Sequence, residues 1–179
     1  MPHEDIVLDP VDHITVDALG KPGKRIFYLQ ALKGKDRISL LIEKFQLQSL
    51  LEGAKEFFTE INSRYPHLEE TFIDFKEEDM RIDPPVDPLF RSGDMGLAYD
   101  ENRDRVCVFA QEAIQNSEER RMVRFWCNRA QLALMTKWGA IIIQRGRQIC
   151  PQCSQPMETE GHFCPKKNGH KRRKKNPRA

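Results

Sequence analysis

The chain has 179 residues, of which 39% are hydrophobic and 31% are charged, and its formal net charge is +2. This length and balance predict one globular domain with a sizeable core and short appendages. No apolar run approaches the roughly 20 residues of a membrane-spanning helix, and residues 1–12 lack the basic and apolar regions of a signal peptide. These features argue against the membrane and secreted classes and predict a cytoplasmic protein.

The two ends of the chain differ strongly in charge. Eight lysines and arginines and no acidic residue follow position 165, so the preceding residues are net acidic. Much of this acidity falls in residues 67–88, a segment with Pro84, Pro85 and Pro88 near its end. We interpret this segment as an exposed acidic linker, and we predict that residues 171–179 form a disordered basic tail.

The first half of the chain, residues 1–66, predicts three strands followed by one helix. An alternating run at 13–19 and apolar runs at 26–32 and 38–42 indicate strands, and a tight hairpin at 33–36 joins the last two. From 43 to 65 the apolar residues recur at spacings of three and four, which is typical of a helix with one face packed on a sheet.

The second half, residues 89–146, repeats this order. Strands are predicted at 90–99, 106–113 and 122–127. Asn128 has the side chain of a helix N-cap, and Gln131 stands where a capping box requires an amide or carboxylate, so a helix is expected from this point to about Ile143.

Because both halves have the same order, we predict two βββα units. The expected fold class is α+β: residues 1–146 form a duplicated body with an antiparallel sheet and helices packed on it. Residues 147–170 are expected to form a small zinc-ribbon-like module, the zinc knuckle. A coincidental likeness between two hairpin-plus-helix segments is the alternative to duplication.

Three of the five cysteines fall between Cys150 and Cys164. The Cys-x-x-Cys turn of Cys150 and Cys153 lets two thiolates face one ion, and a second arm with His162 and Cys164 completes four nitrogen and sulfur ligands. Such a set predicts structural Zn(II), because four protein ligands leave no open position for water or substrate. Metal binding would also supply folding energy to a segment with few large apolar side chains.

Two alternatives to this site stay open. A Cys-x-x-Cys pair also occurs in thioredoxin-like redox proteins, although there it opens a helix, which Pro151 and Pro156 disfavour here. His170 is a rival fourth ligand, but it lies in a run of lysines and arginines that would repel a cation. The remaining cysteines, Cys107 and Cys127, lie in apolar strands and are expected to be buried thiols of a reducing compartment.

Further motifs are spread over nearly the whole chain. They are Gly20–Ala31, Glu43-Lys44 with Gln46, Phe90-Arg91 followed by Met95–Asp100, and the closing Cys150-Pro-x-Cys153 to Gly161-His162-x-Cys164-Pro165 with Asn168-Gly169. With these motifs the chain resembles the uncharacterised bacterial family known as domain of unknown function 3090. The resemblance implies a fold and a zinc-ribbon-like end, but no reaction, because the family has no established activity.

Two further points follow from the resemblance. Members of the family commonly end just after Asn-Gly, so His162 matches the family pattern and His170 does not. The family tends to have glycine after the second cysteine, where a knuckle needs a positive φ, whereas this chain has Ser154. The tail from Lys171 onward is also an addition to the family pattern.

Three classes of function are compatible with these features. The first is a non-enzymatic adaptor or regulatory protein that binds a protein partner through the zinc module. The second is a nucleic-acid or ribosome-associated factor, for which phosphate contacts to RNA or DNA would come from basic residues of the C-terminal region. These candidates are Arg145, Arg147, Lys171, Arg172, Arg173, Lys174 and Lys175.

The third class is an enzyme with a site between the two units. Its weak candidates are Glu43, Lys44, Arg91 and Asp100, which could equally be helix caps and surface pairs. No nucleophile stands in a recognisable catalytic motif, so we assign no catalytic residue.

Overall fold

The structure is a computed structural model that describes residues 5–114, 120–157 and 162–168. The predicted basic tail, residues 171–179, and the rival ligand His170 lie outside the described residues. The described residues form eleven elements. The strands are β1 (Ile6–Leu8), β2 (His13–Leu19), β3 (Ile26–Lys33), β4 (Asp36–Ile42), β5 (Pro88–Asp100), β6 (Arg105–Glu112) and β7 (Met122–Cys127). The helices are α1 (Lys44–Arg64), the short 3₁₀ helix η1 (Glu78–Met80), α2 (Arg129–Gln144) and α3 (Pro165–Asn168).

The seven strands form one continuous sheet in the order β1-β7-β6-β5-β4-β3-β2. The α+β class is confirmed, but the sheet is mixed and not antiparallel throughout, because β1 pairs with β7 and β4 pairs with β5 in parallel. The expected order of three strands and then one helix recurs as β2, β3, β4 and α1 and as β5, β6, β7 and α2, but β1 adds a fourth strand to the first half. Since the halves share a single sheet, the predicted division into two βββα units is not confirmed.

The sheet is strongly curled, and chain length explains why. The edge strands β1 and β2 are joined by only the residues between Leu8 and His13. The five steps from Leu8 to His13 span at most about 18 Å when extended, whereas the edges of a flat seven-stranded sheet would lie about 29 Å apart at roughly 4.8 Å per strand. The sheet therefore bends until β1 contacts β3 and β2 contacts β7, and Val11 N donates to Trp126 O at 2.8 Å.

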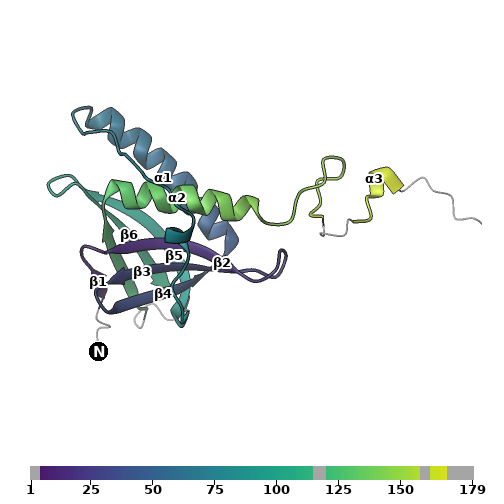
Figure 1. The fold of residues 1–179 in the computed structure, drawn as a ribbon, viewed down its shortest axis with the longest axis horizontal. Helices are drawn as coiled ribbons and strands as arrows, with labels where there is room; N and C mark the ends of the chain where they lie inside the picture. Colours follow the sequence, from purple (N-terminus) through teal and green to yellow (C-terminus); the bar gives the residue numbers. More distant parts are fainter. Residues whose placement is uncertain (1–4, 115–119, 158–161, 169–179) are drawn as a thin grey trace, which may run out of the picture.

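Both long helices cover the same face of this sheet, as Figure 1 shows. α1 contacts β5, α2 contacts β2, and the two helices contact each other. They meet at Gly139 of α2, where an added Cβ would lie 2.9 Å from Leu51 of α1 and 3.2 Å from Val16 of β2. A residue with a Cβ would have to displace the Leu51 side chain, so glycine allows this close approach of α2 to α1 and β2.

The core lies between the curled sheet and the helices. The largest fully buried side chains come from the strands and from both helices, and they include Trp138, Phe125, Ile14, Leu29, Leu40, Leu47 and Leu132. α2 begins as its capping box predicts: Gln131 N donates to Asn128 Oδ1 at 2.8 Å, and Asn128 N donates to Gln131 Oε1 at 2.9 Å.

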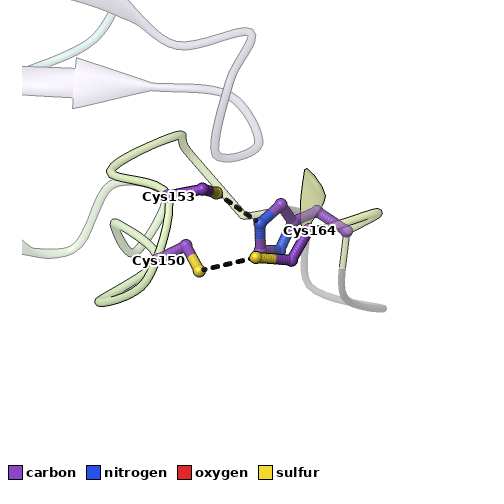
Figure 2. Close-up of side chains that lie close together, drawn as sticks. Cys150, Cys153 and Cys164 are labelled. Atoms are coloured by element: carbon purple, nitrogen blue, oxygen red, sulfur yellow. Dashed lines mark hydrogen bonds between the residues drawn. The ribbon is translucent and has the colours of Figure 1, made fainter. Parts of the chain in front are cut away.

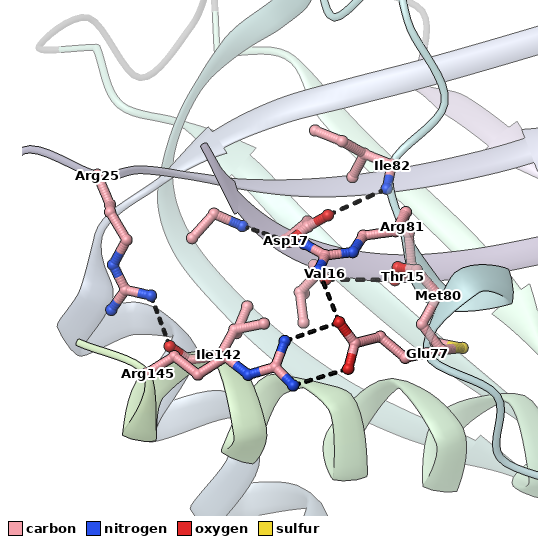
Figure 3. Close-up of polar contacts among 11 residues, drawn as sticks. Thr15, Val16, Asp17, Arg25, Glu77, Met80, Arg81, Ile82, Ile142 and Arg145 are labelled. Carbon is pink, nitrogen blue, oxygen red and sulfur yellow. Dashed lines mark hydrogen bonds and ion pairs between the residues drawn. The ribbon is translucent and has the colours of Figure 1, made fainter. Parts of the chain in front are cut away.

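The segment between the halves is not the exposed linker that its composition indicates, at least from residue 77 to 83. Met80 is 2% exposed and Ile82 is 9% exposed. Buried polar side chains of the sheet bind the backbone of this segment: Thr15 Oγ1 donates to Met80 O at 2.6 Å, and Ile82 N donates to Asp17 at 3.3 Å. Figure 3 shows these contacts on one side of β2.

A further clamp lies on β3. The buried Gln30 donates to Asp83 O at 3.0 Å and accepts from Asp83 N at 2.8 Å. Its amide also donates to Ser39 Oγ of β4 at 3.0 Å. Because these partners satisfy polar groups inside the sheet, the segment packs as part of the body despite its acidity.

The Glu77 carboxylate should make the free energy of unfolding depend on pH in the acid range. Hydrogen bonds from Arg145 and then Arg81 lower the pKa of the Glu77 carboxyl from 4.5 to about 2 (Figure 3). Because the folded-state pKa is the lower one, the stabilisation is complete above about pH 4.5 and is lost as the pH falls toward 2. We expect Glu77→Gln to flatten the loss of melting temperature with acid in this window, and Glu70→Gln, with the same charge change, to leave it unchanged. A parallel loss in Glu77→Gln would contradict the assignment.

Candidate metal centre

A short hairpin places the first two cysteines of the site. After α2, Ile149 and Pro156 form an antiparallel bridge. Met157 N donates to Gln148 O at 2.7 Å, and Cys150 N donates to Gln155 O at 2.9 Å. The hairpin turns tightly enough that Ser154 N donates to Cys150 O at 2.9 Å. Figure 1 shows this segment beyond the end of α2, away from the sheet.

Four side chains converge at this hairpin: Cys150, Cys153, His162 and Cys164, which we call the Cys₃His cluster. Their ligand atoms all lie within 4.8 Å of one another. Cys150 Sγ lies 3.9 Å from Cys164 Sγ, and Cys153 Sγ lies 3.1 Å from His162 Nε2. In Figure 2 the labelled cysteine side chains point toward a common centre. The four predicted ligands are thus brought together and can hold one metal ion.

The three cysteines of the cluster form no disulfide, and the pKa of one of the thiols is lowered. All three cysteines are free, and 3.9 Å between Cys150 and Cys164 sulfurs is far longer than the about 2.05 Å of a disulfide. Backbone hydrogen bonds from Cys153 and then Gln152 lower the pKa of the Cys150 thiol from 9.0 to about 7. Thiolates bind metals and thiols do not, so these hydrogen bonds favour metal binding at Cys150. A backbone hydrogen bond with Gln155 lowers the pKa of the Cys153 thiol, but burial and the neighbouring Cys150 thiol outweigh it, so this pKa is raised.

Ser154 occupies a strained position in the turn. Its φ is +59°, in the left-handed region that costs a residue with a Cβ about 1 kcal/mol or more. The knuckle turn is therefore formed without the glycine that the family resemblance leads one to expect. The strain belongs to the turn that carries both Cys150 and Cys153.

We expect Ser154→Gly to raise metal affinity by about fivefold, because relief of about 1 kcal/mol of strain favours the folded, metal-binding turn. Competition with a chromogenic chelator measures the change. Ser154→Ala is the matched control: it removes the hydroxyl but keeps the Cβ, so its affinity should stay at the level of the unchanged chain. A gain in the alanine variant would assign the effect to the hydroxyl.

Gln152 contacts the cluster, although the spacing of the four ligands along the sequence gives no indication of its role. The Cys164 thiol lies 3.7 Å from Gln152 Oε1, and Lys167 N donates to Cys164 O at 3.1 Å as α3 begins. A metal-bound Cys164 is a thiolate and can only accept, so Gln152 would hold this ligand by donating from its amide Nε2. Gln152 could have been suspected only from its place between the two cysteines of the turn.

The residues considered for phosphate binding are placed as follows. Arg145 is paired with Glu77 through two contacts of 2.8 and 2.7 Å, and its guanidinium lies 5.3 Å from the ring centre of Trp138. Arg147 lies against the turn between β2 and β3, with Nε 3.1 Å from the point where a Cβ on Gly23 would stand. The remaining five, from Lys171 to Lys175, lie outside the described residues.

The weak catalytic candidates do not form one site. Glu43 precedes α1 and pairs with Arg91 of β5, while its backbone N donates to Gln46 Oε1 at 2.7 Å. Asp100 lies at the other end of β5, where it accepts from Arg103 Nε at 2.8 Å in the turn to β6. These contacts are those of a helix start and a turn.

Burial keeps the thiols of the sheet in the protonated form. Cys107 and Cys127 are both buried. Burial raises the pKa of the Cys127 thiol to about 12 and also raises the pKa of Cys107. A thiol that stays protonated is a poor nucleophile, so these side chains act as small apolar residues of the core.

One known protein family matches both the body and the metal centre of this chain. Residues 6–164 match the family described as protein of unknown function (DUF3090). The chain belongs to the DUF3090 family. The match starts at β1 and ends at Cys164, so this DUF3090 chain has all four members of the Cys₃His cluster inside the family region.

No curated protein and no solved structure matches this DUF3090 chain. The basic residues from Lys166 onward fall outside the family region. Within the described residues, no helix is both long enough and apolar enough to cross a membrane.

Proposed function

We propose that the Cys₃His cluster binds one structural Zn(II) ion and that the protein is a non-enzymatic adaptor or regulatory protein of the cytoplasm. The observation that carries the proposal is the convergence of three thiol sulfurs and one imidazole nitrogen within 4.8 Å. Free cysteines in both the sheet and the hairpin support a reducing compartment.

The donor set and its spacing favour zinc. Thiolate and imidazole ligands in a tetrahedral arrangement suit Zn(II), whereas Mg(II) and Ca(II) prefer oxygen. Zn–S bonds of about 2.3 Å would separate two sulfurs of a tetrahedral site by about 3.8 Å, and Cys150 and Cys164 sulfurs lie 3.9 Å apart. Bound zinc would cross-link the hairpin to the arm that carries His162 and Cys164.

A structural role is favoured over a catalytic one. Four protein ligands complete a tetrahedral zinc and leave no position for water or substrate. The metal segment also exposes apolar side chains, since Ile149 is 59% exposed and Phe163 is 69% exposed. Exposed apolar surface beside a rigid metal clip is suited to binding a protein partner.

Elemental analysis tests the metal. Protein purified without chelator should contain one zinc ion per chain, and chelation under reducing conditions should release it. Amide exchange should then rise in the hairpin that follows α2, because metal binding is the folding energy of so short a segment. A zinc content near zero in fully reduced protein would refute the proposal.

A further inference from the structure

A groove of about 800 Å³ lies between α1 and β5, and it shares no lining residue with the Cys₃His cluster. One wall is a face of α1 that includes Leu50, Gly53 and Glu56, and the other is the stretch of β5 from Ser92 to Leu97. Its size is that of a typical ligand site. The proposed zinc site therefore gives this groove no role.

The groove exists because β4 and β5 diverge. β4 pairs with β5 only as far as Leu41 with Arg91, and the chain then turns into α1. Gln46 of α1 closes this end by donating to Ser92 O at 3.0 Å and Gly93 O at 2.5 Å.

At the other end of the groove, Phe57 of α1 meets Tyr99 of β5 with ring centres 5.6 Å apart. Between the two ends, Met95, Gly96 and Leu97 pair only with β6. In the described part of the chain no other strand covers them, so this stretch presents an open strand edge inside the groove.

Two side-chain features also point to a ligand. Gly53 stands in the middle of α1, where glycine is unfavourable, and no atom lies within 4 Å of the position of a Cβ there. Packing within the described chain does not require this glycine. Ser92 is 3% exposed, and its Oγ has no hydrogen-bond partner among the described residues.

The charge of the groove indicates what it would bind. Glu43, Glu56, Glu60 and Asp94 line it, and no lysine or arginine does. Glu43, Glu60 and Asp94 have arginine partners in the chain, that of Asp94 being a distant contact of 3.9 Å with Arg120, whereas Glu56 makes no ion pair in the described residues. Apolar side chains, including Leu50, Met95 and Leu97, supply the rest of the wall. The surface is complementary to a ligand with both cationic and apolar side chains.

We infer that this groove binds a short extended peptide segment of a partner protein, in which lysine or arginine alternates with apolar residues, as an added strand on β5. Main-chain hydrogen bonds to an open edge give such binding its strength, and alternate side chains give it specificity. Lysines would face Glu56 and Asp94, and apolar residues would face α1 across Gly53. The inference rests on the proposed adaptor role and specifies the chemistry of the partner. It does not depend on the metal.

The test titrates the full chain into a fluorescently labelled peptide in which lysine alternates with valine, and fluorescence anisotropy measures the binding. We expect saturable binding that weakens with salt, no binding of the matched peptide with glutamate in place of lysine, and amide shifts at Met95 to Leu97. N-methylation of the peptide at alternate amides should weaken binding by at least about tenfold, because it removes hydrogen bonds to the strand edge. Equal binding of the methylated peptide would overturn the inference.

Variants of α1 locate the site. Gly53→Gln should abolish binding while the fold is kept, whereas Ser63→Gln, which adds the same side chain to α1 outside the groove, should not. Glu56→Gln should weaken binding by about two- to fivefold, and Glu52→Gln, one turn away and outside the groove, should not. Equal effects within either pair would mean that the peptide is only attracted to an acidic surface, and the inference would fail.

Two outcomes would assign the groove to something else. Basic residues 171–175 could occupy it themselves: peptide binding that appears only when these residues are replaced by glutamine in the full chain would overturn the external partner. Concentration-dependent dimers that Gly53→Gln abolishes would indicate a second copy instead. The zinc proposal is separable, since His162→Ala should lose metal and keep peptide binding.

Discussion

Replacing His162 with alanine should lower zinc affinity by more than about 100-fold. Loss of a group that only hydrogen-bonds a metal ligand already lowers affinity by about 10- to 100-fold, and this change removes a ligand itself. His162 Nε2 lies 3.1 Å from Cys153 Sγ, and its loss leaves only three ligands for a tetrahedral ion. Cys150→Ser should have at least as large an effect, because an uncharged hydroxyl replaces a thiolate. Metal content after dialysis against a zinc buffer measures both variants.

His170→Ala is the matched control for this change, since it removes a histidine that lies outside the described residues and the family region. Its zinc content should equal that of the unchanged chain. If the His170 variant loses metal and the His162 variant retains it, the ligand assignment is wrong. If neither variant loses metal, the metal does not bind at the Cys₃His cluster.

Truncation of Trp138 should be the most damaging change in the core, at about 3–5 kcal/mol of unfolding free energy for Trp138→Ala. Trp138 is fully buried in α2. Its ring centre lies 6.3 Å from that of Phe75 and 4.9 Å from the Arg81 guanidinium, so it also holds the acidic segment against the helix. Chemical denaturation measures the loss.

Trp126→Ala is the control, because Trp126 is only partly buried on β7 beneath Arg103. It should cost clearly less. Trp138→Phe should recover much of the stability, since Trp138 Nε1 has no hydrogen-bond partner in the described structure and phenylalanine removes that buried donor. Equal losses for Trp138→Ala and Trp126→Ala would contradict the packing that the structure shows.

The sequence by itself determined the features that depend on neighbours along the chain. The strand at 13–19 and the helix start at Asn128 follow from alternation and from a capping box, both of which act within a few residues. The four ligands of the Cys₃His cluster were also predictable, because a Cys-x-x-Cys turn and a nearby second arm converge on one ion without help from the rest of the fold.

Only the tertiary structure decided how distant segments meet. β1 was missed because three residues show no period, and its partner β7 lies more than a hundred residues away. The acidic segment was predicted to be an exposed linker, but from Met80 to Asp83 it packs on the sheet, because Thr15, Asp17 and Gln30 become partners for its backbone only when the sheet forms.

The groove beside α1 has the same origin. Its open edge depends on the point where β4 and β5 separate, and no residue pattern along either strand marks that point. Pairing between remote strands is set by the packing of the whole sheet, whereas caps, turns and metal ligands are set by local geometry.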